Sequence, residues 1–487
     1  MQMYINGLWC DAADGETIAV INPATEEILD TVPSATVADV ERAIASSKRA
    51  FADWRKLPAR ERCDYLKQMS QKLETHRAEF EELLTREQGK ALAEHREELD
   101  ICLNTIDYYA QLIKNGIGKV IPADNETAFN FVMREPYGPT ACIIPFNYPL
   151  LLLFWKIAPA LAAGNTVIVK PSEKTPLATL KLAVEVLAHF PPGVINIVTG
   201  YGDKIGDALT THPEVPTIAF TGSTAVGQHI IRATAHQVKN LHLELGGKDA
   251  AVIAEDMDPA LAARAIATSS MWNAGQICTS TERVFVAESL YPQFLEELVA
   301  VVAALRLGDG LDPDTDVGPM CDASGFDKVE RHIADAQAKG ARILVGGRRS
   351  SQHDSGYFFE PTVIADAIPD MLCMQEETFG PTVAVAPYRD IEQAIDLVNA
   401  TSYGLGAVFM GHNPRQIRQF FVNVKAGTVW INDPLPDNVA GPFGGMKHSG
   451  SHSRELGEEG LFSFMETKHV HWDFDPAARA INWFDKS

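Results

Sequence analysis

The sequence predicts an α/β protein in which a domain built on a doubly wound parallel sheet is followed by a second α/β domain. Short apolar strands alternate with helical stretches of about 10 to 15 residues, which is the pattern of βαβ units. This alternation begins again after Gly246 and Gly247. The 487 residues are also about three times the usual length of one domain. Two large domains are therefore expected.

The N-terminal part is expected to form hairpins followed by a helical layer. The opening residues are rich in Asn, Pro and Gly, and the Asn6-Gly7 pair is favoured in two-residue hairpin turns. Over the range Val37–Leu112, apolar residues recur at helical spacing, with Glu, Lys and Arg on the other faces and breaks near Pro58 and Gly89. This range predicts several helices with solvated charged faces.

Apolar runs place the strands of the two sheets. A helix is expected from the turn after Lys170 to about Phe190. The strands expected in the first domain are at 166–170, 194–198 and 217–220, and those expected in the second domain are at 250–254, 283–286, 342–345 and 383–386.

Composition and charge restrict the class of protein. Hydrophobic residues make up 46% and charged residues 22% of the chain, which is the usage of an ordinary folded domain. The net charge of −22, from 42 basic and 64 acidic residues, repels nucleic acid and anionic membrane surfaces. No apolar stretch reaches the roughly 20 residues that a bilayer requires. We therefore expect a small-molecule ligand, with no nucleic acid and no membrane.

The cysteines and the first residues indicate the compartment. Seven cysteines without close pairs argue against both a disulfide framework and a zinc ribbon. The N-terminal segment lacks the basic residues and apolar run of a secretory signal. We expect a cytoplasmic protein without a metal site.

Three polar side chains suit chemistry on a carbonyl group. Cys278 lies in a turn of small residues rather than in an apolar run, as an accessible nucleophile requires. Glu244 stands between two leucines, where burial raises the pKa of a carboxyl and makes it a stronger base. Asn147 lies in a turn bounded by prolines, and a fixed amide can donate to an oxyanion. Each of the three, taken alone, also fits an ordinary structural role.

Two other segments suit a nucleotide. Gly222 and Ser223 lie between a strand and a helix, where main-chain N–H groups and the helix dipole favour a phosphate. This segment lacks the G-x-G-x-x-G pattern, so its signal is weak by itself. Lys170 and Glu173 follow a strand, where an ammonium group and a carboxylate can bind ribose hydroxyls.

Together with the segments 376–381 and 442–450, these motifs resemble the aldehyde dehydrogenase superfamily over essentially the whole chain. Within it, the sequence resembles enzymes for betaine aldehyde, aminoaldehydes and semialdehydes. The resemblance implies NAD(P)-dependent oxidation of an aldehyde to the free acid through a Cys278 thiohemiacetal and thioester. Asn147 and the main-chain N–H of Cys278 would hold the oxyanion, and Glu244 would activate the water that hydrolyses the thioester.

The resemblance also implies a cofactor site. Because the carboxylate of Glu173 would accept the 2′-hydroxyl of NAD and repel a 2′-phosphate, NAD is expected as the preferred cofactor and NADP as an alternative. The residues implied are Lys170 and Glu173 at the adenine ribose, Gly222 and Ser223 at the pyrophosphate, and Glu377 and Phe379 at the nicotinamide, with Phe146 completing the set.

The family fold would divide the chain into three parts and make it an oligomer. The C-terminal residues carry several aromatic side chains, among them Trp472 and Phe474 and, further on, Trp483 and Phe484, which need a surface to cover them. A homodimer or homotetramer is therefore expected. The parts are an NAD-binding domain at 1–117 and 137–248, a catalytic domain at 249–448, and a small β bridging and oligomerisation element at 118–136 and 464–487.

The substrate stays open between two classes. Aromatic rings at Tyr148 and Trp155, in the family's substrate tunnel, suit a cationic aldehyde because rings attract an ammonium group. The tunnel segment Leu435–Phe443 has no Trp at its start to complete an aromatic cage, so a hydrophobic or aromatic aldehyde is an equal alternative. The tunnel residues are Tyr148, Leu152, Trp155, Ile277, Thr279 and Phe443.

Two other functions stay as alternatives. A family member without catalysis would keep the fold as a binding protein, but intact catalytic residues argue against it. An enzyme that passes the acyl group to coenzyme A is the second alternative, and such enzymes generally lack the carboxylate found here at Glu244.

Overall fold

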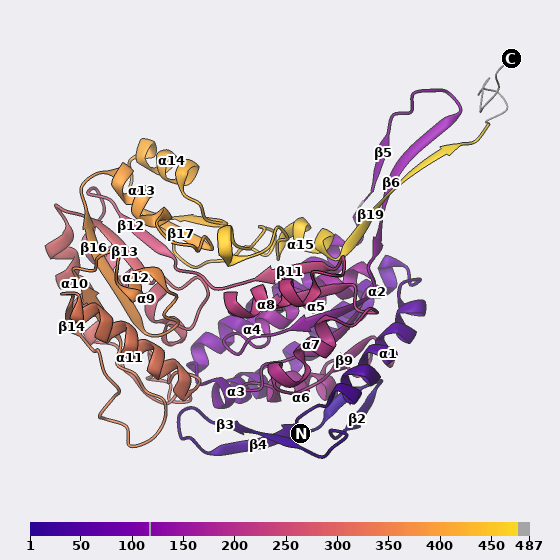
Figure 1. Ribbon diagram of the computed structural model, residues 1–487, viewed down its shortest axis with the longest axis horizontal. Coiled ribbons are helices and arrows are strands. Elements are labelled where there is room, and N and C mark those ends of the chain that lie inside the picture. The colour runs from indigo at the N-terminus through magenta and orange to yellow at the C-terminus, as the bar shows by residue number, and fades with distance from the viewer. Residues whose placement is uncertain (116–117, 476–487) are drawn as a thin grey trace.

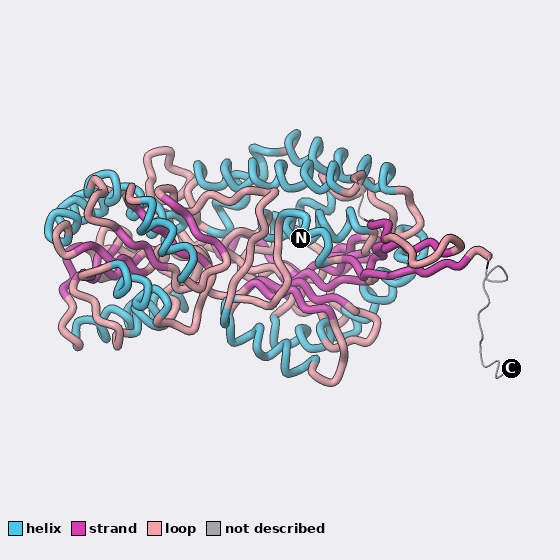
Figure 2. The backbone as a smooth tube through the Cα atoms, turned by 90° about the horizontal axis from the view of Figure 1, so that it is seen from above, coloured by secondary structure: helices cyan, strands magenta, loops and turns pink. Residues whose placement is uncertain are grey.

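The computed structural model describes residues 1–115 and 118–475. They contain two seven-stranded sheets, and each sheet is the centre of its own α/β domain (Figure 1). Seen from above, helices lie on both sides of the strands (Figure 2). A narrow β arm projects from the first domain. The predicted succession of two α/β domains is confirmed.

The first sheet has the strand order β11-β10-β7-β8-β9-β1-β2. Its first five strands are parallel, and a helix joins each of them to the next in the chain, as in doubly wound folds. Three of these strands lie within one or two residues of their predicted bounds. The five parallel strands are β7 (Pro139–Ile143), β8 (Thr166–Lys170), β9 (Ile195–Ile197), β10 (Thr217–Thr221) and β11 (Asn240–Glu244).

The N-terminal hairpin extends this sheet at one edge. β1 (Met3–Ile5) pairs antiparallel with β9 and with β2 (Leu8–Cys10), and the Asn6-Gly7 pair forms the predicted turn with positive φ at both residues. A second hairpin, of β3 (Thr17–Ile21) and β4 (Ile28–Pro33), forms a separate two-stranded sheet. The pairing of β1 with β9 was not predicted, because partners so far apart in the sequence leave no local pattern.

The predicted helical layer consists of α1 to α4. Its breaks lie where expected, since Pro58 is the N-cap of α2 and Gly89, with a φ of 98°, is the C-cap of α3. The predicted helix to Phe190 is shorter: α6 ends at Glu185, because the main-chain N–H groups of Val186 and Leu187 both donate to the carbonyl of Leu182 and close the last turn. The helices of this domain are α1 (Val37–Trp54), α2 (Ala59–Thr75), α3 (Arg77–Gln88), α4 (Leu92–Leu112), α5 (Leu151–Ala163), α6 (Leu177–Glu185), α7 (Gly202–Thr210) and α8 (Thr224–Thr234).

The second sheet has the order β14-β15-β16-β13-β12-β17-β18, and all its strands are parallel except β14. Its strands are β12 (Ala250–Ile253), β13 (Arg283–Ala287), β14 (Arg342–Val345), β15 (Thr362–Ala365), β16 (Thr382–Tyr388), β17 (Gly406–Met410) and β18 (Thr428–Ile431). Its helices, and those that follow it, are α9 (Pro259–Met271), η1 (Trp272–Gly275), α10 (Tyr291–Ala303), α11 (Ala323–Ala338), α12 (Leu372–Gln375), α13 (Ile391–Asn399), α14 (Pro414–Asn423), η2 (Lys447–Ser449) and α15 (Gly457–Ser463).

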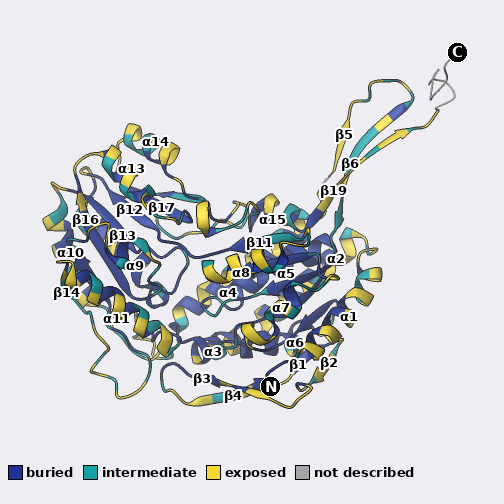
Figure 3. Ribbon diagram, in the orientation of Figure 1, coloured by how far each residue is buried: buried dark blue, intermediate teal, exposed yellow. Residues whose placement is uncertain are grey.

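The β arm is an antiparallel sheet in the order β19-β6-β5. β19 (Met465–Asp473) pairs with β6 (Ala128–Pro136) along its whole length, and β5 (Lys119–Ile121) lies on the other side of β6. The arm is largely exposed, whereas the inner strands of both large sheets are largely buried (Figure 3). Residues 476–487 of the predicted bridging element, including Trp483 and Phe484, lie outside the described residues.

Each sheet falls within one of the three predicted parts of the chain, although their boundaries stay a prediction. Separate buried apolar clusters pack around the first and the second large sheet. Among the helices of the described ranges, none combines the length and apolar character needed to cross a membrane.

Candidate active site

A cavity of about 930 Å³ opens at the carboxyl ends of β7, β8, β10 and β11. The strand order reverses between β7 and β10, and open α/β sheets bind their ligands at such a point. All ten residues predicted for catalysis and cofactor binding line this one cavity: Asn147, Glu244 and Cys278, together with Phe146, Lys170, Glu173, Gly222, Ser223, Glu377 and Phe379.

A strained turn carries Cys278. The residues Asn273, Ala274 and Gly275 of η1 have φ values of 52°, 51° and 70°, so the chain leaves the direction of α9 there. A Cβ at Gly275 would lie 2.0 Å from the carbonyl oxygen of Gly380, which only glycine avoids. Strained backbone of this kind is concentrated at functional sites. Here it brings the Cys278 side chain to the cavity.

Two consecutive glycines, Gly246 and Gly247, pack against the other side of the loop that carries Cys278. A Cβ at Gly247 would lie 2.2 Å from the carbonyl oxygen of Cys278, and a Cβ at Gly246 would lie 2.7 Å from Oε1 of Glu377. The chain that leaves Glu244 therefore passes directly between the cysteine loop and Glu377. This close packing explains why two glycines follow the strand.

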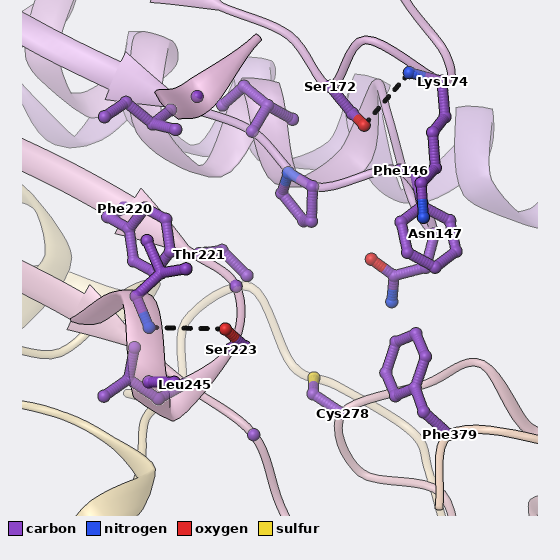
Figure 4. Close-up of a pocket in the computed structure, with 18 of the residues that line it drawn as sticks. Phe146, Asn147, Ser172, Lys174, Phe220, Thr221, Ser223, Leu245, Cys278 and Phe379 are labelled. Carbon is purple, nitrogen blue, oxygen red and sulfur yellow. Dashed lines mark hydrogen bonds between the residues drawn. The ribbon is translucent and has the colours of Figure 1, made fainter. Parts of the chain in front are cut away.

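Asn147, in the loop after β7, lies beside Cys278, and both side chains point into the cavity (Figure 4). The Asn147 side chain is buried, and its amide nitrogen donates to the carbonyl of Gln276 at 3.0 Å. A side-chain amide has two N–H groups, so one is left to donate to a ligand. The arrangement is that of an oxyanion donor next to a thiol.

Glu244 ends β11 and is 3% exposed. Among the described residues, neither of its carboxylate oxygens has a hydrogen-bond partner of normal geometry. Burial raises the pKa of Glu244 well above its usual range, as expected from its two leucine neighbours, and Glu455 raises it further. Lys156 and the thiol of Cys278 lower it. An unpartnered, strongly basic carboxylate next to a thiol suits a general base.

A buried ion pair lies behind Glu244. Nζ of Lys156, on α5, is 2.6 Å from Oε1 of Glu455 and donates to Oγ1 of Thr221 at 2.6 Å. The motif analysis missed this pair. Its signal was a single lysine in the otherwise apolar helix 151–163, because a buried charge requires a partner.

The thiol of Cys278 is not ionised in advance. Burial raises its pKa well above the usual range, and the carboxyl groups of Glu244 and Asp249 raise it further. These surroundings disfavour the thiolate, so a base that takes the proton of the thiol assists its attack on a carbonyl carbon.

The other end of the cavity suits a dinucleotide. Ser223 caps α8, and its Oγ accepts from the main-chain N–H of Val226 at 3.4 Å, so the first N–H groups of this helix face the cavity wall. Lys170 and Glu173 form an ion pair at 3.6 Å and both line the cavity. An ammonium group and a carboxylate at this place fit ribose hydroxyls.

Two phenylalanines and a glutamate border the middle of the cavity. The rings of Phe146 and Phe379 meet edge to face, with 5.8 Å between their centroids. Burial raises the pKa of Glu377 to about 7, and its Oε1 accepts from the main-chain N–H of Gly247 at 3.0 Å. Lys174 lies 4.5 Å from the Phe146 ring centroid and pairs with a carboxylate of the second domain. Sequence reasoning missed Lys174, which lies next to Glu173.

The six predicted substrate residues line neither of the two cavities described. Four of them belong to, or pack against, one apolar cluster that Cys278 also contacts. The rings of Trp155 and Phe443 meet within it, with 5.0 Å between their centroids. Their role in the substrate tunnel stays a prediction. These four residues are Tyr148, Leu152, Trp155 and Phe443, while Ile277 and Thr279 flank Cys278 and are buried.

A second cavity, also of about 930 Å³, lies between α4 and the start of the predicted tunnel segment. Residues 436–439 form one wall, and α4 contributes Asp107 and Tyr108. Burial raises the pKa of Asp437 to about 7, and its carboxyl group in turn raises the pKa of the Cys278 thiol. Asp437 thus lines this cavity and is close enough to Cys278 for its charge to raise the pKa of the thiol. The sequence analysis placed the segment here but did not identify either aspartate.

The described residues contain no group of three or more His, Cys, Asp or Glu side chains that could hold a metal ion.

The family model described as "Aldehyde dehydrogenase family" matches residues 9–470. The chain belongs to this family. A 3-sulfolactaldehyde dehydrogenase of Pseudomonas putida is 38% identical over 470 residues, which are 96% of each chain. Aminoaldehyde dehydrogenase 2 of Pisum sativum is 38% identical, over 96% of this chain and 95% of its own.

The fold also matches solved structures of aldehyde dehydrogenases. A crystal structure of betaine aldehyde dehydrogenase from Staphylococcus aureus, in complex with NAD⁺, aligns with a TM-score of 0.96 at 37% identity and covers 100% of this chain and 96% of its own. The resemblance inferred from the motifs is therefore confirmed. The protein is an aldehyde dehydrogenase, an oxidoreductase of a family that works with NAD(P).

Proposed function

We propose that the protein oxidises an aldehyde to the free carboxylic acid with NAD, and with NADP as a second cofactor, through a thioester on Cys278. The observation that carries this proposal is the convergence of Cys278, Glu244 and Asn147 in the same cavity as the residues suited to a dinucleotide. The S. aureus relative in complex with NAD⁺, which has the same fold, supports the cofactor.

The first step is addition of the thiol to the aldehyde. Glu244 takes the proton from the Cys278 sulfur, and the sulfur bonds to the carbonyl carbon while the carbonyl oxygen becomes an alkoxide. The free N–H of the Asn147 amide and the main-chain N–H of Cys278 stabilise that oxygen. The product of this step is a thiohemiacetal.

Residues at the ends of several strands would hold the cofactor in the cavity. Lys170 and Glu173 would bind the adenine ribose, Gly222 and Ser223 the pyrophosphate, and Glu377, Phe379 and Phe146 the nicotinamide end. A Cβ at Gly222 would lie 2.6 Å from the Phe220 ring, so the packing of this turn on Phe220 requires glycine. When bound, NAD(P)⁺ supplies the hydride acceptor that turns the hemiacetal into a thioester.

Hydrolysis completes the reaction. After Glu244 has released the thiol proton to solvent, its carboxylate removes a proton from water and the hydroxide attacks the thioester carbon. The Cys278 sulfur leaves as a thiolate and takes the proton back from Glu244, which restores both groups. The buried, strongly basic Glu244 carboxylate next to the sulfur favours this outcome over transfer to coenzyme A.

The second cavity favours a cationic aldehyde over an anionic one. Asp107 and Asp437 line it, and no lysine or arginine of the described chain does. The carboxyl group of Asp437 also raises the pKa of the Cys278 thiol. We place the ammonium or polar tail of the aldehyde in this cavity and its carbonyl group at Cys278. A hydrophobic aldehyde would gain nothing from the two carboxyl groups.

We further propose a cytoplasmic homodimer or homotetramer in which the β arm is the bridging and oligomerisation element. Its exposed apolar side chains include Val120 at 71% and Trp472 at 58% exposure, more than a solvated strand needs. The seven cysteines, all unpaired in the described chain, support a reducing compartment.

One experiment tests function and substrate class together. Purified protein is given NAD or NADP with betaine aldehyde, 4-aminobutyraldehyde, succinate semialdehyde, benzaldehyde or hexanal, and NADH or NADPH absorbance and the acid product are measured. We expect the highest kcat/KM with a cationic aldehyde and NAD. Absence of cofactor reduction with every aldehyde, in protein that binds NAD, would overturn the proposed function.

A variant pair tests the role of Asp437. Asp437→Asn should lower kcat/KM for the cationic aldehydes about tenfold and leave hexanal unchanged, the size of one lost charge-assisted hydrogen bond. Asp433→Asn, an exposed aspartate of the same loop, is the matched control and should change neither. A preference for succinate semialdehyde, or equal effects on all aldehydes, would contradict the substrate class but not the reaction.

A further inference from the structure

A buried lysine lies on the far side of the Asn147 loop from the cavity. Lys90, between α3 and α4, is 1% exposed, and its Nζ is 2.7 Å from Oε2 of the equally buried Glu98 on α4. The same Nζ donates to the main-chain carbonyl of Asn147 at 3.3 Å and lies 3.5 Å from the ring centroid of Tyr148. One ammonium group thus contacts two consecutive residues next to the proposed oxyanion site.

Glu98 holds the next residues of the same loop. Its Oε1 accepts from the main-chain N–H groups of Leu150 and Leu151 at 3.0 and 3.1 Å, so this carboxylate caps the start of α5. Burial acts to raise the pKa of Glu98, but Lys90 and a hydrogen bond with His95 outweigh it and hold the pKa to about 2. Glu98 is therefore ionised throughout the working pH range.

Asn273 completes the connection to the nucleophile loop. Its side-chain amide donates to the carbonyls of Asn147 and Gln276, at 3.1 and 3.0 Å. The Asn147 carbonyl thus accepts from Lys90 on one side and from Asn273 on the other. The side-chain amide of Asn147 donates to the carbonyl of Gln276. Both the main chain and the side chain of Asn147 therefore have a fixed place relative to Cys278.

We propose that the Lys90–Glu98 ion pair is a positioning device that sets Asn147 as the oxyanion donor, an inference that rests on the proposed function. Removing the charge of Lys90 leaves the Asn147 carbonyl held by Asn273 alone and the Tyr148 ring without its cation, and the amide then shifts relative to the alkoxide. Displacement of a catalytic group by about 1 Å costs on the order of 100-fold in rate. Packing alone does not explain the pair, because a buried ion pair adds little stability compared with apolar residues of similar volume.

A double-mutant cycle separates positioning from general structural support. Lys90→Met keeps the shape of the side chain without its charge, and should lower kcat/KM for the aldehyde about 10- to 100-fold, mainly through the rate of the NADH burst. The dissociation constant for NAD should stay within about twofold, since Lys90 is not among the residues that line the cofactor cavity. In an Asn147→Ala background, Lys90→Met should cost less than about threefold, because the group it positions is gone.

Arg62→Met is the matched control. Arg62, on α2, is buried against the C-terminal end of α5, where its Nε donates to the carbonyl of Ala162 at 2.8 Å. Loss of this cation should lower thermal stability while leaving kcat/KM within about twofold. The comparison shows what the loss of a buried cation does without a connection to Asn147.

A third variant covers the case in which Lys90→Met does not fold. Lys90→Met/Glu98→Gln leaves no uncompensated buried charge and should show the same loss of burst rate, which again nearly vanishes in the Asn147→Ala background. Equal losses in both backgrounds, or failure of both variants to fold, would overturn the positioning role. If the wild-type protein oxidises no aldehyde, the proposed function fails instead, whatever the variants do.

Discussion

The side-chain amide of Asn147 donates a hydrogen bond to the main-chain carbonyl of Gln276, with 3.0 Å between nitrogen and oxygen. This bond joins the loop after β7, in the first domain, to the loop that presents Cys278, in the second. The donor and the nucleophile therefore keep a fixed separation even though they come from different sheets. Preorganisation of this kind is what makes an oxyanion donor effective, since no reorganisation is needed during the reaction.

Asn147→Ala should lower kcat about 100- to 1,000-fold, the usual cost of removing one oxyanion donor. Rapid-mixing measurement of the NADH burst should locate the loss in the steps before thioester formation. Asn165→Ala removes another buried asparagine, whose amide donates to the carbonyl of Phe464 at 2.9 Å, and serves as the control. A burst of normal rate in Asn147→Ala would show that the amide does not stabilise the alkoxide.

Glu244→Gln should abolish turnover but leave a stoichiometric burst of NADH when the thiol is ionised at alkaline pH. The amide cannot take a proton from water, so the thioester on Cys278 accumulates. Mass spectrometry of the intact protein should detect the added acyl group, and Cys278→Ala should not carry it. Steady turnover in Glu244→Gln would assign the hydrolytic base to another group.

The pH profile should follow the protonation of Glu244. A general base must be deprotonated, and its raised pKa moves the rising limb of kcat/KM to higher pH than an ordinary carboxyl would give. Glu455 contributes to raising that pKa, and Lys156 lowers it. Glu455→Gln should therefore shift the limb to lower pH, because it removes a negative charge and leaves the Lys156 cation. An unchanged or alkaline-shifted limb would contradict this electrostatic account.

Glu173→Gln should raise the ratio of kcat/KM with NADP to that with NAD at least about tenfold, which corresponds to about 1.4 kcal/mol. The change removes the negative charge that repels a 2′-phosphate and leaves the cation of Lys170 without its partner at 3.6 Å. Asp203→Asn, at another lining position of the same cavity, controls for a general change in charge. A ratio that does not move would place the 2′ position of the ribose elsewhere.

Local patterns predicted most of the elements, and local motifs together with the family resemblance predicted ten residues of the cofactor cavity. The strands β8 and β14 have the predicted bounds. Such features are encoded within a few residues, so they can be read without the tertiary structure. The ten predicted residues come together in the cavity because each lies at the end of a strand or in a loop beside one.

Features that depend on contacts distant in the sequence were missed. The charged faces of the 37–112 helices were expected to be solvated, but Glu94, His95 and Glu98 on α4 are buried, because other loops pack over them and use them as caps. Lys90 and Asp437 carry no motif, and their roles arise only where two segments meet. Helical spacing shows which residues share a face, but it does not show what covers that face.

The β arm provides the last prediction. Trp472 on β19 is directly opposite Phe129 on β6, and these side chains are 58% and 42% exposed. Two adjacent aromatic side chains at this exposure indicate a covered surface in the assembled protein. Trp472→Asp should therefore lower the mass measured by sedimentation to that of a smaller assembly, while Ile28→Asp, at a 63% exposed position of β4, leaves it unchanged. Because the arm lies outside the catalytic cavity, the dissociated chain should still form the thioester on Cys278; an unchanged mass for Trp472→Asp would mean that the arm is not the contact between subunits.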